Sequence, residues 1–221
     1  MRPKVLIAWS SGKDSAWALH VLRRAGEFDI VGALTTVTET FSRVSMHGVR
    51  EQLLQAQLKA AGLPAIAVRI PFPCPNDIYE QKMSVAVSNA KAAGVTHIAF
   101  GDLYLEEVRA YRERHLARSG IIPIFPIWGR ATRDLAQEMI DNNVEAFLTT
   151  VDLAKLSASF AGRRFDSALL DDLPEGIDPC GENGEFHSFV TAGPMLSRKI
   201  AIEFGKVVAR DGFAYADLLP G

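Results

Sequence analysis

Short apolar runs alternate with amphipathic stretches along the first 150 residues of the chain. The apolar runs are rich in β-branched side chains, as buried strands are, and cover residues 4–9, 28–37, 65–70, 97–101, 121–127 and 146–151. Between them, apolar side chains recur at helical spacing over residues 15–25, 49–61, 77–93, 106–119 and 132–142. Such alternation predicts right-handed βαβ units and a parallel sheet covered by helices on both faces.

The pattern therefore predicts a Rossmann-like, doubly wound α/β domain over residues 1–150, built on a five-stranded parallel sheet, with the run at 146–151 closing the alternation. Beyond about Asp152 the alternation ends. Short helices are expected over 153–170, a linker over 171–176, and strands over 186–190 and 199–208. We expect a second, small α+β domain over residues 151–221.

The first strand-to-helix turn carries the most informative side chains, which are Ser10, Ser11, Gly12, Lys13, Asp14 and Ser15. Small residues let the backbone turn sharply, and the N–H groups and positive dipole end of the following helix point into that turn. With three hydroxyls and the ammonium of Lys13, these groups form an anion site suited to a di- or triphosphate. The alternative is a plain capped turn with a solvated Lys13, which would not need three small residues beside a lysine.

Two common phosphate motifs are excluded by spacing. A Walker A loop needs a glycine where this chain has Ile7, and a hydroxyl residue after the lysine where it has Asp14. The dinucleotide pattern G-x-G-x-x-G is also absent from this turn.

Composition limits the binding partners and the cellular compartment that are expected. The chain has 221 residues and a net charge of −2, which gives no general attraction to nucleic acid or an anionic membrane. Cys74 and Cys180 lie far apart, so neither a disulfide framework nor a structural zinc site is expected, and a reducing compartment fits. The N-terminus resembles no signal or transit peptide, and no apolar run reaches the ~20 residues of a membrane span. We expect a cytoplasmic protein without a membrane partner, and nucleic acid is not expected as a partner.

A second group of reactive side chains lies in residues 178–188, which we call the acidic turn. It holds Cys180, Glu182, Glu185 and His187 among two glycines that allow close backbone approach. A solvated acidic turn leading into a strand is the alternative interpretation. A metal site from Cys180, Glu182 and His187 matches no recognised ligand spacing.

The phosphate loop (residues 10–15) resembles the PP-loop, S-G-G-x-D-S, of the N-type ATP pyrophosphatases, with Ser11 at the first glycine position. Three further motifs, at residues 43–50, 101–113 and 181–187, resemble the ATP-binding family that includes diphthine-ammonia ligase. This resemblance implies a HUP-type nucleotide domain followed by a small domain bearing a Gly-Glu-x-Gly-Glu-Phe signature. It also implies ATP-driven amide formation through an adenylylated carboxylate.

The resemblance assigns expected roles. A carboxylate of the substrate, a small molecule or a modified protein side chain, would attack the α-phosphorus of ATP and release pyrophosphate, and ammonia or an amine would then displace AMP. The phosphate loop, Lys13 and Mg²⁺ would stabilise the leaving charge. Nucleotide contacts are expected from Thr35, Gly101 and Asp102, with Asp102 also a candidate Mg²⁺ ligand. Substrate contacts are expected from His47, Arg50, Glu106, Arg109, Tyr111 and Arg112. Glu182 and Glu185 would bind ammonium or accept its proton, with His187 as an alternative base.

Two other functions stay open at this stage. One is an RNA-thiolating or sulfonucleotide-reducing enzyme, in which Cys74 or Cys180 would have to act alone. The other is a regulatory module that binds ATP without turnover. The sequence names neither the substrate nor the nitrogen donor, and it leaves the oligomeric state open, a homodimer included.

Overall fold

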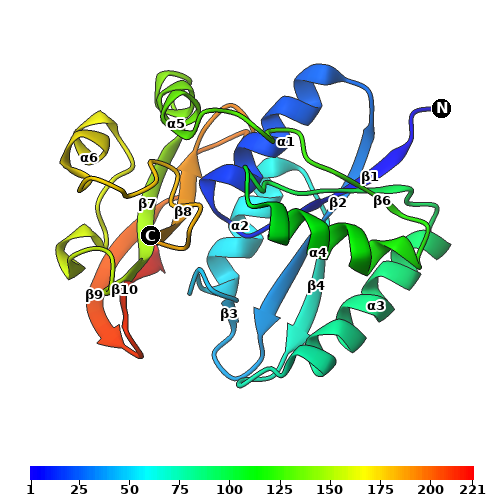
Figure 1. The fold of residues 1–221 in the computed structure, drawn as a ribbon, viewed down its shortest axis with the longest axis horizontal. Helices are drawn as coiled ribbons and strands as arrows, with labels where there is room; N and C mark the ends of the chain where they lie inside the picture. The colour runs from blue at the N-terminus through cyan, green and yellow to red at the C-terminus, as the bar shows by residue number, and fades with distance from the viewer.

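The computed structural model describes all residues from 1 to 221 and contains two sheets (Figure 1). Parallel strands of the first sheet follow the order β4 (Ala65–Ile70), β2 (Asp29–Thr38), β1 (Lys4–Ala8), β5 (His97–Ala99) and β6 (Ile122–Ile124). The short strand β3 (Arg43–Val44) pairs antiparallel with the end of β2. The chain moves outward from β1 to β4 and then returns to β5 on the other side of β1. Ligands of such sheets bind beyond this switch point.

Helices cover both faces of the parallel sheet, which confirms the doubly wound fold predicted from the sequence. Helices α1 (Lys13–Ala25) and α2 (Glu51–Ala61) pack on the face that carries the buried side chains of Val5 and Ile7. Helices α3 (Asn76–Ala92) and α4 (Glu106–Ala117) pack on the opposite face, with Leu6. Figure 1 shows the two helix pairs on opposite sides of the sheet.

Glycine and proline set the ends of these helices. Gly26 and Gly62 adopt left-handed backbone angles, with φ of +66° and +67°, and end α1 and α2. This conformation costs a residue with a Cβ about 1 kcal/mol or more. Pro75 stands just before α3, where its fixed φ angle suits the start of a helix.

The second sheet is antiparallel and has the order β8 (Phe186–Ala192), β7 (Glu145–Asp152), β10 (Phe213–Pro220), β9 (Ile202–Arg210). The strand expected at 146–151 therefore exists as β7, but it does not close the parallel sheet. Its apolar composition suits a buried strand in either sheet, and only the pairing partners β8 and β10 decide the difference. The change of sheet lies between β6 and β7, earlier in the chain than residue 150.

Short helices accompany the second sheet: α5 (Thr132–Asp141), the 3₁₀ turn η1 (Ala158–Phe160) and α6 (Ser167–Asp172). This arrangement confirms the small α+β unit expected from the sequence. The sequence analysis missed strand β10, although Ala214, Ala216 and Leu218 alternate there as buried residues between less buried ones. No helix combines the length and the apolarity needed to cross a membrane.

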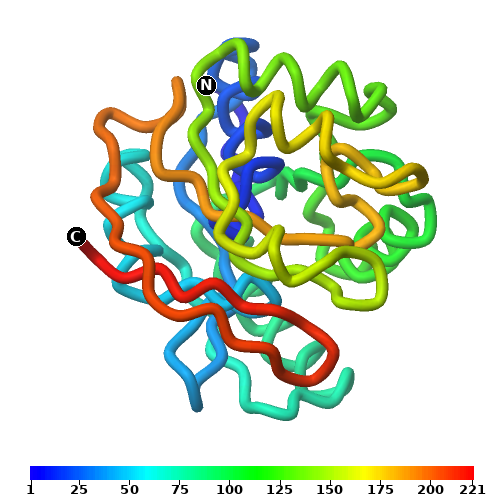
Figure 2. The backbone as a smooth tube through the Cα atoms, turned by 90° about the vertical axis from the view of Figure 1, so that its left-hand side faces the viewer, coloured from blue at the N-terminus to red at the C-terminus, as the bar shows by residue number.

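The two sheets share one core of 41 buried residues, while a smaller core of 11 lies behind the parallel sheet. Gln57 joins the sheets at the phosphate loop: its amide nitrogen donates to the carbonyl oxygens of Ser11 (3.1 Å) and Val190 (2.7 Å). Its amide oxygen accepts a bond from the indole of Trp9 at 2.8 Å. In Figure 2 the C-terminal hairpin β9–β10 runs beside the segment around residues 40–50. Through Gln57, the phosphate loop is tied to strand β8 of the second sheet.

Candidate functional site

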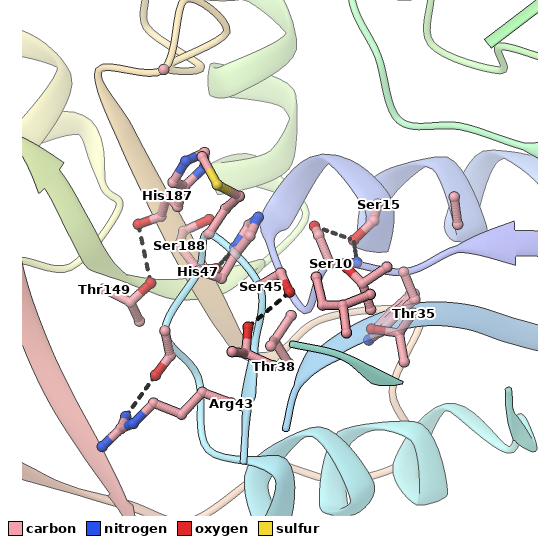
Figure 3. Close-up of a pocket in the computed structure, with 18 of the residues that line it drawn as sticks. Ser10, Ser15, Thr35, Thr38, Arg43, Ser45, His47, Thr149, His187 and Ser188 are labelled. Carbon is pink, nitrogen blue, oxygen red and sulfur yellow. Dashed lines mark hydrogen bonds between the residues drawn. The ribbon is translucent and has the colours of Figure 1, made fainter. Parts of the chain in front are cut away.

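A cavity of about 1060 Å³ opens at the carboxyl edge of the parallel sheet, between the two sheets. Its walls come from the phosphate loop, the end of β2 with the following loop, Gly101–Asp102, the acidic turn and the β9–β10 hairpin. Figure 3 shows Ser10, Ser15 and Thr35 at one end, His187, Ser188 and Thr149 at the other, and His47 between them. Segments far apart in the sequence thus meet around one space.

The phosphate loop turns sharply at Ser11, whose φ angle is +72° and whose side chain is fully buried. The hydroxyls of Ser10 and Ser15 lie 3.2 Å apart on the cavity wall (Figure 3). The backbone N–H of Gly12 donates to the hydroxyl of Ser10 at 3.3 Å. The backbone N–H of Lys13 donates to the hydroxyl of Ser188 in the second sheet at 3.2 Å.

The ammonium of Lys13 is 2% exposed and has a complete set of partners. It donates to both carboxylate oxygens of Asp14, at 2.9 and 3.0 Å, and to the carbonyl oxygen of Cys180. It also lies 5.4 Å from the ring centres of Phe165 and Phe186, within cation–π range. Burial is the largest single influence on the pKa of Lys13 and lowers it, but the combined attraction of Asp14, Cys180 and Glu182 outweighs burial, so that pKa is raised. Lys13 is therefore a fixed positive charge between the phosphate loop and the acidic turn.

Gly101 follows β5 and lies against the start of α1. A Cβ atom at this position would lie 2.8 Å from backbone atoms of Asp14 and Ser15, so no larger residue fits without movement. One residue further, the carboxylate of Asp102 lines the cavity and accepts a bond from Arg112 at 3.3 Å. The carboxyl end of β5 thus lies in direct contact with the phosphate loop.

The acidic turn is organised by its own carboxylates. One oxygen of Asp178 accepts bonds from the backbone N–H groups of Cys180 (2.8 Å) and Glu182 (3.2 Å). Glu185 is 2% exposed, and one of its oxygens accepts bonds from the backbone of Asp178 (3.2 Å) and the side chain of Asn183 (3.1 Å). Glu185 therefore supports the turn from inside and does not line the cavity.

Glu182, in contrast, reaches the cavity. One of its carboxylate oxygens accepts the backbone N–H of Leu103 at 2.7 Å. Burial, together with the nearby carboxylates of Asp14 and Asp102, raises the pKa of Glu182 to about 7. At neutral pH this side chain is divided between its acid and its carboxylate form, as a group that transfers protons should be.

His47 and His187 form a pair in the same cavity, with ring centres 4.6 Å apart. Nδ1 of His47 lies 2.9 Å from the backbone carbonyl oxygen of Ser188. Burial lowers the pKa of His47 to about 4 and that of His187 to about 3, and the positive charge of Lys13 adds to both shifts. Both imidazoles are therefore uncharged at neutral pH.

A further cluster connects residues 43–50 with β10. Arg50 donates two bonds to the carboxylate of Asp217, at 3.0 and 2.6 Å, and Arg43 donates one at 2.9 Å. Arg43 also donates to the carbonyl oxygen of Gly48 at 2.6 Å (Figure 3). The cluster fixes the loop that carries His47 against the second sheet.

Comparison with known families decides the relationship. A family model described as the diphthamide synthase N-terminal domain matches residues 3–123, and one described as the diphthamide synthase C-terminal domain matches residues 131–215. The chain belongs to the diphthamide synthase family. The boundary between the two matches coincides with the change of sheet between β6 and β7.

Curated relatives carry the name diphthine–ammonia ligase. The Bos taurus protein is 29% identical over 127 residues, which are 55% of this chain and 48% of the relative. The Homo sapiens protein is 28% identical over a match with the same coverage, and the Rattus norvegicus protein is 24% identical over 153 residues, 67% of this chain and 57% of the relative. The chain thus spans about half the length of the curated relatives it matches.

Most of the site residues expected from the sequence line the cavity of this diphthamide synthase family member. They are Ser10, Lys13, Asp14, Ser15, Thr35, His47, Gly101, Asp102, Tyr111, Arg112, Glu182 and His187. Ser11 and Gly12 belong to the phosphate loop, but they are not among the residues that line the cavity. Three expected substrate contacts, Arg50, Glu106 and Arg109, do not line the cavity. Arg50 is paired with Asp217, and Arg109 with Glu113 at 2.9 Å. A substrate role for these three stays a prediction.

The sequence analysis missed several cavity residues, among them Arg43, Thr149, Ser188, Lys206, Arg210 and Asp217. Arg43 lies in a motif that the analysis used, but its spacing gives no sign of its partner in β10. Ser188 ends the acidic turn, but nothing in that motif points to its hydroxyl. The others come from strands of the second sheet, whose side chains carry no local motif. Only the contact between the two sheets brings them to the phosphate loop.

Proposed function

We propose that this protein is an ATP-dependent, AMP-forming carbon–nitrogen ligase that converts a carboxylate into an amide. One observation carries the proposal: the phosphate loop and the acidic turn face the same cavity and are joined by Lys13. The first element suits a nucleotide triphosphate, and the second supplies groups for the nitrogen-transfer step. Membership of the diphthamide synthase family supports both halves.

Several features support a nucleotide at this edge. The hydroxyls of Ser10 and Ser15 flank the N-terminus of α1, where the helix dipole favours phosphate. The hydroxyl of Thr35 is buried at the cavity wall and has no hydrogen-bond partner within the protein. A buried polar atom without a partner costs about 1–3 kcal/mol, so a ligand atom that bonds to it is favoured. Thr35 and Gly101 flank the phosphate loop on its two sides and suit the adenosine part.

The carboxylates near the loop fit a magnesium ion that arrives with ATP. Asp14, Asp102 and Glu182 line the same cavity, and their mutual repulsion contributes to the raised pKa of Glu182. No group of three His, Cys, Asp or Glu side chains is close enough to hold a metal ion by itself. Mg²⁺ commonly takes one or two carboxylates and completes its shell with phosphate oxygens and water. Asp102 and Asp14 would hold it, and its charge would help stabilise the departing pyrophosphate.

The residues of the chain have distinct parts in the proposed reaction. The substrate carboxylate attacks the α-phosphorus, the bond to the β-phosphate breaks, and pyrophosphate leaves with its electrons. Ser10 and Ser15 orient the triphosphate. The positive charge of Lys13 stabilises the negative charge that builds up on the departing pyrophosphate. Ammonia or an amine then attacks the acyl-adenylate, and the C–O bond to AMP breaks. Glu182 or His187, both at the cavity wall, is placed to accept the proton that the nitrogen loses.

The names of the relatives suggest the first substrate to try, since they pair diphthine with ammonia. Arg112 lies at the cavity wall beside Asp102, and Arg43 at its far end beside Asp217. Either guanidinium suits a substrate carboxylate.

The structure favours this proposal over thiol chemistry. The thiol of Cys180 is 2% exposed and donates to the carbonyl oxygen of Thr132 at 3.3 Å. Burial raises the pKa of Cys180, so its thiolate form is disfavoured. Cys74 donates only to the neighbouring Pro75 carbonyl and lies far along the chain from Cys180. Of the two cysteines only Cys74 lines the cavity, so no pair of thiols is available there.

The deciding experiment follows the fate of ATP. The protein is incubated with ATP, Mg²⁺, ammonium chloride and a diphthine-bearing protein, and AMP, ADP and pyrophosphate are measured. The proposal expects AMP and pyrophosphate in equal amounts, only when the carboxylate is present. Bound ATP without turnover against a panel of carboxylates would favour a regulatory module. Loss of turnover in the Cys74→Ser/Cys180→Ser variant would favour thiol chemistry, whereas the ligase keeps its activity.

A further inference from the structure

The pair formed by His47 and His187 has a defined arrangement. His47 lies in the turn after β3 and His187 in β8 of the second sheet, and the two rings have centres 4.6 Å apart and planes inclined at 35°. His47 also lies against the phosphate loop, because a Cβ atom added at Gly12 would lie 2.6 Å from its Cε1 atom. The pair therefore sits next to the place proposed for the phosphates. Figure 3 shows both side chains at the pocket wall.

The hydrogen bond of His47 fixes which nitrogen carries its proton. A backbone carbonyl oxygen only accepts hydrogen bonds, so Nδ1 of His47 must donate to Ser188. An uncharged imidazole carries one N–H, and Nε2 is therefore left with a free electron pair. His187 is uncharged as well, so one of its ring nitrogens also has a free electron pair.

These acceptor nitrogens are unoccupied and within reach of the cavity. Neither Nε2 of His47 nor a ring nitrogen of His187 has a hydrogen-bond partner in the protein, and none is sealed from the surface. No carboxylate bonds to either ring. The ammonium of Lys13 is the charged group that lowers the pKa of both histidines. The site thus offers hydrogen-bond acceptors in a positive field, which opposes a cation and suits an uncharged N–H donor.

We propose that His47 and His187 form the binding site of the nitrogen donor, and that this site takes uncharged ammonia or a small uncharged amine, not ammonium. The inference rests on the proposed ligase function. Two N–H groups of ammonia donate to the two imidazoles, and the nitrogen lone pair stays free to attack the acyl carbon. The C–N bond forms, the C–O bond to AMP breaks with its electrons going to AMP, and one N–H proton passes to the acceptor nitrogen of His187, one of the two bases named above.

Glu182 defines the competing site. A carboxylate binds ammonium through its charge, so binding there would follow the ionisation of Glu182. The two sites differ in their response to pH. Between pH 6.5 and 8.5 the fraction of free ammonia rises about 100-fold, while the ammonium concentration changes little. For a site that binds only free ammonia, the apparent Kd, expressed as the total concentration of ammonia and ammonium, should therefore fall across this range.

The first test needs no carboxylate substrate. The 221-residue protein is labelled with ¹⁵N-histidine, and its five histidines are assigned by single substitutions. Ammonium chloride is then added at pH 6.5 and 8.5, with potassium chloride as the ionic-strength control. The Nε2 signal of His47 should show the Nδ1–H form and should move at pH 8.5 far more than at pH 6.5. Signals of His20, His97 and His115 should stay. Equal shifts at both pH values, or none, would overturn the proposal.

The second test uses matched variants. In His47→Asn, the side-chain amide keeps a donor for the Ser188 carbonyl but lacks an acceptor at the Nε2 position. The KM for ammonia should rise about tenfold, as expected for one lost hydrogen bond. This rise should clearly exceed any change in the KM for ATP measured by the carboxylate-dependent exchange of pyrophosphate into ATP, which precedes nitrogen entry. His187→Asn should raise the same KM.

The outcomes separate the two ideas. Normal exchange with an unchanged KM for ammonia in both variants would overturn the histidine site and leave the ligase standing. Absence of exchange in the wild-type protein would overturn the ligase, and the histidine spectra would still decide whether the rings bind ammonia. Thermal unfolding of each variant shows whether a change reflects the site or the fold.

Discussion

The ammonium of Lys13 donates a hydrogen bond to the carbonyl oxygen of Cys180, 167 positions further along the chain. This contact joins the phosphate loop to the acidic turn. Because Lys13 also neutralises Asp14, the charge expected to act on phosphate has a structural part as well. The acidic turn and the loop that is proposed to bind ATP therefore share one buried positive charge.

Replacement of Lys13 by methionine should impair both stability and activity. Asp14 and the carbonyl of Cys180 would lose their partner inside the protein, and breaking a buried ion pair costs about 3–5 kcal/mol. Chemical denaturation at pH 7 measures the loss, and AMP release should disappear. Addition of Asp14→Asn should recover part of the stability, since the unpaired charge is then removed.

Lys155 offers the matched control. It is 38% exposed and donates to the carbonyl of Asn183 in the same acidic turn at 2.6 Å. Lys155→Met should cost under about 1 kcal/mol. Equal losses for the two lysine variants would show that Lys13 has no special structural part.

Ser11→Gly should stabilise the protein. Ser11 holds a left-handed φ angle of +72°, which costs a residue with a Cβ about 1–2 kcal/mol, and its buried hydroxyl has no partner. Glycine removes both costs, but it also increases the conformational entropy of the unfolded chain, which partly offsets the stabilisation. The free energy of unfolding measured in urea should therefore rise by about 1 kcal/mol.

Ser11→Ala separates these two causes, because alanine removes the hydroxyl and keeps the strained backbone. Ser11→Ala should therefore raise the free energy of unfolding by less than Ser11→Gly does. If Ser11→Gly instead destabilises the protein, the hydroxyl has a favourable contact that the present account does not include.

Asp217→Asn should weaken the contact between residues 43–50 and β10, by about 1 kcal/mol at pH 7. Hydrogen bonds from Arg50 and Arg43 hold the pKa of Asp217 below its ordinary value. A lowered carboxyl pKa adds stability above the pKa of the unfolded chain, and this stability is lost as the pH falls through the folded value. The difference between wild type and variant should therefore shrink below about pH 4.

The control for Asp217 is Asp171→Asn, since Asp171 is 73% exposed and pairs only with Arg133, which is 64% exposed. Its unfolding free energy should match wild type at every pH. A difference for Asp217→Asn that stays constant from pH 7 to pH 3 would contradict the ion-pair explanation.

Glu182→Gln should stabilise the nucleotide-free protein at alkaline pH. The folded pKa of Glu182 is raised to about 7, so the folded state holds a proton that the unfolded chain has already released. Wild-type stability from this group is therefore present at acidic pH and is lost as the pH rises toward about 7. The glutamine keeps an acceptor for the N–H of Leu103 but carries no charge.

The unfolding free energy of Glu182→Gln relative to wild type should rise between pH 5 and pH 8 by an amount on the order of 2 kcal/mol. If Glu182 also accepts a proton in the reaction, the wild-type rate at saturating free ammonia rises through about pH 7, and that rise is absent in the variant. A relative stability that is independent of pH would contradict the raised pKa.

The sequence by itself determined the parallel sheet and the phosphate loop. Both depend on local patterns: apolar runs that alternate with helical periodicity, and small residues beside Lys13 at a strand-to-helix turn. Parallel strands place their carboxyl ends at one edge, so Thr35, Gly101 and Asp102 were correctly expected near the loop. These features follow from neighbours in the chain and from the handedness of βαβ units.

Only the tertiary structure decided how the two halves meet. β7 has the composition of a buried strand, and the antiparallel pairing with β8 and β10 alone assigns it to the second sheet. Lys13, His47 and Asp217 have partners 167, 141 and at least 167 positions away, respectively, so no local spacing reports them. Such partners are chosen by which buried polar groups remain unsatisfied when the sheets pack, and that depends on the whole fold.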